Sequence, residues 1–129
     1  MAVWAQDELQ RINGADELEI AAVRQDGTLR GRRPIWVVRV GDDLYVRAAY
    51  GNASCWHRVA RETGRAHISA GGVTKDVAVE AADENLFDQV DAAYRSKYGD
   101  RYASIVDSIT HTEHRASTLR LVPAPEAET

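Results

Sequence analysis

A run of apolar residues at positions 34–40 constrains the fold more than any other segment. Residues 35–38 are Ile, Trp, Val and Val in succession, a pattern typical of a strand that is covered on both faces. Gly41-Asp42-Asp43 then predicts a tight hairpin turn. Residues 44–49 alternate in side-chain character and predict the partner strand. The segment therefore predicts an antiparallel pair of strands, one of which is buried.

Four more strands are predicted by alternation and by turn signals such as Gly71-Gly72. They cover residues 17–24, 67–70, 73–81 and 117–122. Apolar spacing of three and four predicts helices at 4–13, 55–63, 83–98 and 102–109. Six strands in hairpin order favour an antiparallel barrel, because closure removes open sheet edges. The predicted fold class is α+β, a six-stranded antiparallel split β-barrel with peripheral helices.

The alternation also predicts which side chains fill the barrel. One face of each strand is apolar, and these faces are expected to share one interior. The predicted interior residues are Leu18, Ile20, Ile35, Val37, Leu44, Val46, Val77, Val79, Leu119 and Leu121.

Length and composition limit the remaining possibilities. A chain of 129 residues fits one domain, expected at 1–122, with a flexible C-terminal tail at 123–129. A single cysteine, Cys55, excludes an internal disulfide framework. No apolar run reaches the roughly 20 residues of a membrane span, and the acidic start of the chain is unlike a secretory signal. The expected location is the cytoplasm, with no membrane partner.

The charge is distributed unevenly along the chain. Residues 28–65 contain eight arginines and three acidic residues, a balance of +5, whereas the whole chain has a formal net charge of −4. A nucleic-acid-binding domain is usually basic as a whole, so no nucleic-acid partner is expected. A basic zone inside an acidic protein favours one small anionic ligand, and the alternative is an ordinary solvated surface.

Several segments carry a resemblance to known proteins. The chain from Trp4 to Val122 resembles a family of small bacterial proteins of unknown function. The segments that carry it are Asp7-Glu8-Leu9, Ile35 to Arg47, Gly71 to Val77, Ala92 to Gly99, Ala103 to Val106 and Thr118 to Val122.

A more distant resemblance adds a fold and a cofactor. Gly31-Arg32-Arg33-Pro34, the following hairpin, and Tyr50-Gly51 before Trp56-His57 resemble the flavin- and deazaflavin-binding split β-barrels, which include nitroreductase-like and pyridoxamine phosphate oxidase-like proteins. This resemblance implies a homodimer with a cofactor, FMN or a deazaflavin, in a shared cleft. The site residues that it implies are Arg32, Arg33, Tyr50, Gly51, Ser54, Trp56 and His57.

The residues around this segment also predict an anion site on physical grounds. The small-residue loop at 50–54 leads into a helix, whose first backbone N–H groups attract a phosphate or carboxylate. Arg47 and Arg58, with Arg32 and Arg33, could clamp the same anion. Trp36 and Trp56 could stack on a planar ring. His57 is the candidate catalytic residue, because its ordinary pKa suits proton transfer near neutral pH.

Other functions remain open at this stage. The preferred hypothesis is that the protein is a flavin- or deazaflavin-dependent oxidoreductase that acts on an aromatic or anionic small molecule. The same pocket without a cofactor could serve an isomerase or cyclase with His57 as acid and base, or a ligand-binding protein with no catalysis. No metal site is expected, because His111 and His114 lack a predictable third ligand and are predicted to lie in a polar loop.

Overall fold

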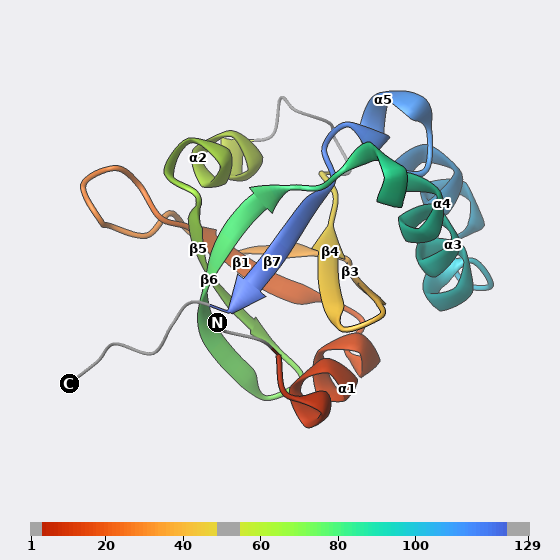
Figure 1. Ribbon diagram of the computed structural model, residues 1–129, viewed down its shortest axis with the longest axis horizontal. Helices are drawn as coiled ribbons and strands as arrows, with labels where there is room; N and C mark the ends of the chain where they lie inside the picture. Colours follow the sequence, from red (N-terminus) through yellow and green to blue (C-terminus); the bar gives the residue numbers. More distant parts are fainter. Residues whose placement is uncertain (1–3, 49–54, 124–129) are drawn as a thin grey trace.

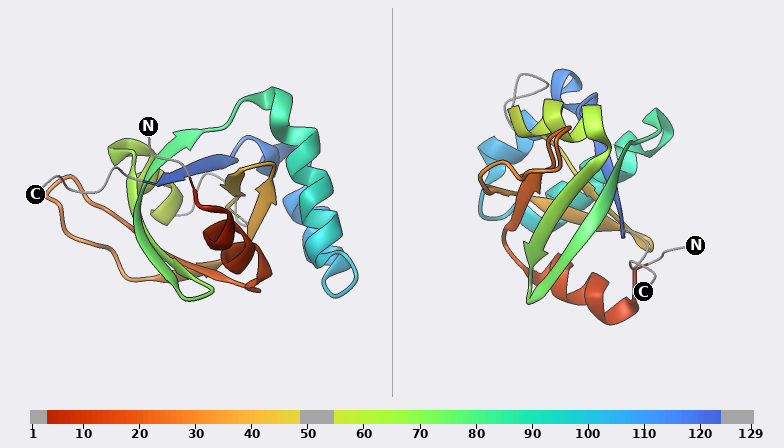
Figure 2. Two further views of the ribbon diagram at one scale, coloured as in Figure 1. Left: turned by 60° about the horizontal axis from the view of Figure 1, so that its bottom comes forward. Right: turned by 90° about the vertical axis from the view of Figure 1, so that its left-hand side faces the viewer.

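The computed structural model describes residues 4–48 and 55–123. Its seven strands form one antiparallel sheet with the order β2-β1-β5-β6-β7-β4-β3, and the sheet curls into a nearly closed barrel (Figures 1 and 2). The strands are β1 (Leu18–Ala22), β2 (Arg33–Ile35), β3 (Val37–Val40), β4 (Asp43–Val46), β5 (Arg65–Ala70), β6 (Val73–Ala81) and β7 (Leu119–Pro123). The predicted split β-barrel is confirmed.

The strand count differs from the predicted six for a simple reason. The predicted strand at 34–40 is divided at Trp36 into β2, which pairs with β1, and β3, which pairs with β4. These two strands are the opposite ends of the strand order but are neighbours in the chain. Ile35 and Val37 both contact the barrel interior, whereas Trp36 and Val38 contact the outer cluster. One bent segment therefore joins the two edges of the sheet.

Five helices in the described part of the chain lie around the barrel. They are α1 (Gln6–Gly14), α2 (Cys55–Thr63), α3 (Phe87–Tyr98), α4 (Ala103–Ile109) and α5 (Thr112–Arg115), and a 3₁₀ turn, η2 (Glu84–Leu86), precedes α3. Asp83 caps this turn by accepting a hydrogen bond from the N–H of Asn85 at 2.9 Å. None of the helices in the described ranges is long and apolar enough to cross a bilayer.

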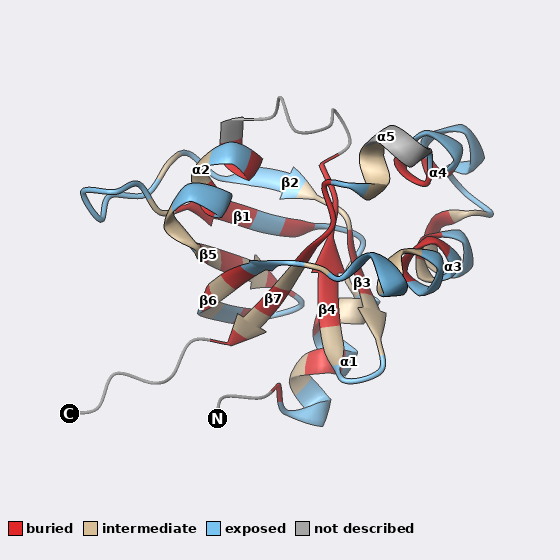
Figure 3. Ribbon diagram, turned by 45° about the horizontal axis from the view of Figure 1, so that its top comes forward, coloured by how far each residue is buried: buried red, intermediate tan, exposed pale blue. Residues whose placement is uncertain are grey.

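The barrel interior is the main hydrophobic core. All ten residues predicted from the alternation contact it; nine are buried and Ile35 is partly buried. Leu9 and Ile12 of α1 and Trp56 and Ala60 of α2 belong to this core, and Figure 3 shows buried positions on both helices. The two helices thus cover opposite ends of the barrel (Figure 1).

A second core lies outside the barrel. Helices α3 and α4 pack on the outer face of β3 and β4, where Val38 and Tyr45 meet Val90, Tyr94 and Ile109. This layer holds the bend at Trp36. The indole stacks on the Tyr98 ring with centroids 4.0 Å apart and planes 4° apart, and offset-stacked aromatic pairs of this kind add to the stabilisation from burial.

The ends of some elements differ from the sequence expectation. The predicted polar loop around His111 and His114 contains the short helix α5, and Pro123, expected to begin the tail, ends β7. Positions 49–54 and 124–129 lie outside the described residues. They include all of the predicted small-residue loop at 50–54 and most of the predicted tail at 123–129.

The hairpin between β5 and β6 confirms the Gly71-Gly72 signal. Both glycines have positive φ, 57° and 83°, which L-residues with side chains rarely adopt. A Cβ on Gly71 would also lie 2.2 Å from the backbone oxygen of Arg11. The turn therefore requires glycine both for its backbone conformation and for its contact with α1.

Candidate functional site

Helix α2 places His57 against the chain that precedes β7. The imidazole is 1% exposed, and its Nε2 lies 2.9 Å from the backbone oxygen of Ser117. A carbonyl oxygen can only accept, so Nε2 donates and, in the neutral ring, Nδ1 is the acceptor. Burial lowers the pKa of His57 below its usual 6.5, and the nearby Arg61 charge lowers it further, against the opposing effect of the Ser117 bond. The ring is therefore neutral at pH 7.

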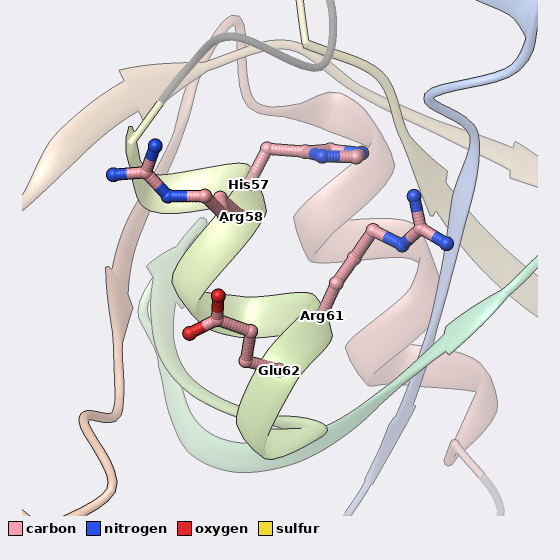
Figure 4. Close-up of a pocket in the computed structure, with 4 residues that line it drawn as sticks. All are labelled: His57, Arg58, Arg61 and Glu62. Carbon is pink, nitrogen blue, oxygen red and sulfur yellow. The ribbon is translucent and has the colours of Figure 1, made fainter.

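Four residues of α2 line a hollow of about 280 Å³, namely His57, Arg58, Arg61 and Glu62 (Figure 4). Residues four apart share a helix face, so His57 and Arg61 project to one side and Arg58 and Glu62 to the other (Figure 4). Both arginines are exposed. Two guanidinium groups against one carboxylate make this hollow suitable for an anion.

Ser117 connects both sides of the segment that the sequence marks as the anion-binding loop. Its Oγ accepts the backbone N–H of Ala48 at 3.0 Å and donates to the His114 oxygen at 2.6 Å. Its own carbonyl oxygen accepts from His57. Ala48 precedes positions 49–54 and His57 follows them, so one buried serine anchors both flanks.

The two tryptophans that are predicted to stack on a ligand ring lie in different hydrophobic cores. Trp56 is 8% exposed and belongs to the barrel interior, beside His57 at a ring distance of 5.5 Å. Trp36 packs in the outer layer on Tyr98, and its ring lies 5.4 Å from that of Tyr102. The structure does not bring these two rings together around one ligand position.

Arg47 has protein partners for most of its guanidinium group. The side chain is 1% exposed and forms an ion pair with Asp91 of α3. Nε donates to Thr118 Oγ1 at 2.8 Å, and Nη1 and Nη2 each donate at 3.1 Å to the backbone oxygens of Ile109 and Phe87. These bonds tie the residue that follows β4 to the outer helices, and Arg47 is not among the described residues that line the hollow at α2. A ligand-binding role for Arg47 stays a prediction.

The other predicted residues are dispersed or undescribed. Arg32 precedes β2 and Arg33 begins it; both are exposed, and neither is among the described residues that line the hollow. Tyr50, Gly51 and Ser54 lie outside the described residues. From the predicted set, the hollow contains His57 and Arg58.

Sequence reasoning missed three contributors. Arg61 and Glu62 each follow a predicted residue by four positions on one helix, a spacing that could have identified them. Ser117 is distant in sequence from α2, and no local pattern marks it. Among the described residues, no group of three or more His, Cys, Asp or Glu side chains is arranged to hold a metal ion.

Solved structures with the same fold include cofactor-binding proteins. The heme storage protein HutZ from Vibrio cholerae aligns with a TM-score of 0.65 at 16% identity, covering 97% of this chain and 92% of HutZ. An FAD-binding protein from Mesorhizobium loti aligns with a TM-score of 0.60 at 15% identity, covering 95% and 92% of the two chains. At these identities the likeness shows the fold alone.

A third solved structure has a similar fold. A putative pyridoxamine 5'-phosphate oxidase from Listeria innocua aligns with a TM-score of 0.58 at 13% identity, covering 92% of this chain and 90% of the other. No curated protein matches the sequence. A family model for an uncharacterized protein conserved in bacteria, DUF2255, matches residues 8–121, and the chain therefore belongs to this bacterial family.

Proposed function

We propose that this protein binds a flavin or deazaflavin by its phosphate at α2 and acts as a small-molecule oxidoreductase in the cytoplasm. The observation that carries the proposal is the hollow at α2, which is lined by two arginines, Arg58 and Arg61, and by the neutral imidazole of His57. The fold supports it, because similar structures include proteins described as binding FAD. One fold can host unrelated functions, so the residues of the hollow carry the main argument.

The donor groups at the hollow fit the phosphate end of such a cofactor. A guanidinium group can bind two phosphate oxygens at once through parallel N–H bonds. Glu62 on the same helix partly offsets the two positive charges and would disfavour a more highly charged anion. The described residues that line the hollow include no aromatic ring besides the imidazole of His57.

The ring of the cofactor therefore requires a surface elsewhere. We place it against a second subunit of a homodimer, as the resemblance to split-barrel proteins implies. The bound cofactor would supply hydride or electron transfer to an aromatic or anionic substrate. His57 would contribute a neutral imidazole that can accept a proton at the hollow.

An absorption spectrum and a titration test the proposal directly. The full chain is titrated by calorimetry with FMN, with a deazaflavin cofactor, with hemin and with sulfate. The proposal expects binding of FMN or the deazaflavin with a single site per chain. Binding of hemin alone, or of none of the four, would overturn it, and a colourless protein that binds only a non-redox anion would favour the cofactor-free alternatives.

Two variants locate the bound phosphate. Loss of a charge-assisted hydrogen bond costs about 1.5–3 kcal/mol, so Arg58→Ala and Arg61→Ala should each weaken binding at least about ten-fold. Arg11→Ala is the matched control, because Arg11 is an exposed arginine on α1, at the opposite end of the barrel. An equal loss in the control would show that the hollow has no special role.

A further inference from the structure

The arginines of this protein differ in their ion pairs. Those that form an ion pair with an aspartate are Arg39, Arg47, Arg101, Arg115 and Arg120. Among the described residues, by contrast, no carboxylate pairs with Arg30, Arg32 or Arg33. Arg30 and Arg32 lie between β1 and β2, and Arg33 is the first residue of β2. The described part of the fold therefore leaves three neighbouring guanidinium groups available to a partner.

The segment between β1 and β2 has a defined structure of its own. Val23 and Leu29 form a β-bridge. Asp26, the only acidic residue between the two strands, accepts hydrogen bonds from the N–H and the hydroxyl of Thr28 at 2.9 and 2.7 Å. Figures 1 and 2 show the segment projecting from the barrel on the side where α2 lies. Its one carboxylate is thus engaged inside the turn and not with the arginines that follow.

An exposed leucine precedes these arginines. Leu29 is 48% exposed, and the segment around it is also mostly exposed (Figure 3). The other exposed large hydrophobic side chains of the described residues, Tyr102 and Ile105, belong to α4 or adjoin it. Both lysines of the chain, Lys75 and Lys97, lie in other elements. An apolar side chain beside arginines and no lysine is typical of protein–protein interfaces, in which arginine is enriched and lysine is depleted.

The residues that form this feature, called here the 29–33 surface, are Leu29, Arg30, Arg32 and Arg33. We propose that the 29–33 surface binds an acidic protein whose carboxylates lie around an apolar side chain. The three guanidinium groups pair with the carboxylates, and Leu29 packs against the apolar side chain. This interaction goes beyond the proposed oxidoreductase function and does not depend on a cofactor at α2.

The composition of the 29–33 surface favours a protein over other polyanions. Single-stranded nucleic acids stack their bases on exposed aromatic side chains, and residues 23–33 contain no aromatic residue. Binding to an anionic bilayer grows with the apolar area that is inserted, and Leu29 is the one large hydrophobic side chain exposed in this segment. A guanidinium group matches a carboxylate through two parallel bonds. Arg101 shows this contact within the protein, because its Nη1 and Nη2 donate to the two carboxylate oxygens of Asp16 at 3.3 and 2.8 Å.

Two labelled peptides test the proposal on the full-length protein. One consists of repeated Glu-Glu-Leu units and the other of repeated Glu-Glu-Ser units, so they have the same charge and differ in the apolar side chain. Fluorescence anisotropy at physiological ionic strength should show that the leucine peptide binds at least about five-fold tighter, because burial of leucine adds to the charge pairing. Added salt should weaken both complexes. Equal affinities, no binding, or binding that salt does not weaken would overturn the proposal.

Charge reversal locates the contact. Arg32→Glu and Arg33→Glu should each weaken binding of the leucine peptide at least about five-fold, because each replaces an attraction by a repulsion. Arg11→Glu is the matched control, because it changes the net charge equally and Arg11 is an exposed residue of α1, which covers the end of the barrel opposite to α2. Its effect should be less than about two-fold, since distant exposed charges are screened. An equal loss in all three variants would overturn the proposal.

Leu29→Ser gives a readout that does not depend on charge. The variant should bind the leucine peptide more weakly and the serine peptide with unchanged affinity, so that the two peptides become similar. A retained preference for the leucine peptide would place the apolar contact elsewhere and overturn the proposal.

Other occupants of the surface are tested with the same variants. A single-stranded RNA homopolymer and vesicles that contain phosphatidylserine should both bind the wild-type protein more weakly than the leucine peptide does. Tighter binding of either one, lost in Arg32→Glu, would assign the surface to a nucleic acid or a membrane and overturn the proposal. Light scattering tests a second copy of the chain. The mass should be the same for the wild type and Arg32→Glu, and dissociation of a wild-type dimer by this substitution would also overturn the proposal.

Discussion

The imidazole Nε2 of His57 and the carbonyl oxygen of Ser117 are 2.9 Å apart, and this bond joins α2 to the segment that precedes β7. Both residues are buried. The bond lies at one end of the barrel. The imidazole of His57 can gain a proton and a charge as the pH falls, so the stability of the fold depends on pH.

We expect wild-type stability to fall as the pH drops from 7 to 5, and more steeply than that of His57→Gln. The folded pKa of His57 is lowered below 6.5, so the unfolded chain binds a proton that the folded chain resists. The free energy of unfolding contributed by this residue is complete above 6.5 and is lost below it. Urea unfolding at several pH values measures the difference. A His57→Gln profile parallel to the wild type would contradict the expectation.

Interior substitutions should be costly in proportion to the cavity that they leave. Ile20→Ala and Leu121→Ala remove fully buried side chains of the barrel core and should each lower the free energy of unfolding by roughly 2–5 kcal/mol. Ile105→Ala is the control, because that side chain is 45% exposed and should change stability by about 0.5 kcal/mol or less. Chemical denaturation gives all three values, and similar values for buried and exposed positions would refute the assigned interior.

Arg47→Ala should lower the stability of the fold, whether or not Arg47 binds a ligand. It removes the buried guanidinium of Arg47 from Asp91, which keeps its second ion pair, to Arg115 at 3.1 Å. Breaking a buried pair costs about 3–5 kcal/mol when the remaining charge has no partner, so the loss here should be at most of that size. Arg47→Met combined with Asp91→Asn should recover part of this loss, because the carboxylate is removed together with the guanidinium, while Arg115 keeps its ion pair with Asp88. Thermal unfolding is the measurement. A stable Arg47→Ala protein with weakened FMN binding would instead support the ligand role that the sequence indicates.

The assembly state is the fourth prediction. A homodimer of two 14.3 kDa chains should appear in light scattering at about twice the mass of one chain, with the two-fold contact that is commonest among oligomers. A monomer at micromolar concentration would remove the shared cleft from the proposed function and leave the barrel unaffected. Measurement at two protein concentrations distinguishes a stable dimer from a weak one.

The barrel itself could be predicted because strand alternation is a local signal. A side chain such as Leu44 or Leu121 faces inward by the two-residue period of its strand, whatever the rest of the chain does. The division of the 34–40 segment could not be predicted in this way. It depends on the pairing of the first half, β2, with β1 and of the second half, β3, with β4. These pairings are a property of the closed sheet.

The candidate site was less accessible to sequence reasoning. His57 and Arg58 were found because they follow a small-residue loop and belong to a predicted helix. Arg47 was grouped with them by charge and proximity in sequence, but alternation along β4 directs it outward to Asp91. Ser117 is 60 residues from His57 in the chain, so only the folded structure shows that they meet.

The bend at Trp36 has a consequence for aggregation. The exposed edge strands of a sheet can form backbone hydrogen bonds with another chain. In this protein the two edge strands, β2 and β3, are separated by a single residue. Neither edge can move far from the other while the backbone is intact, since one residue spans at most about 3.6 Å. A proteolytic cut beside Trp36 would free both edges at once. The nicked protein would then have two strand edges available for intermolecular pairing, although β2 stays paired with β1 and β3 with β4, so we expect the intact segment at Trp36 to protect the barrel against fibre formation.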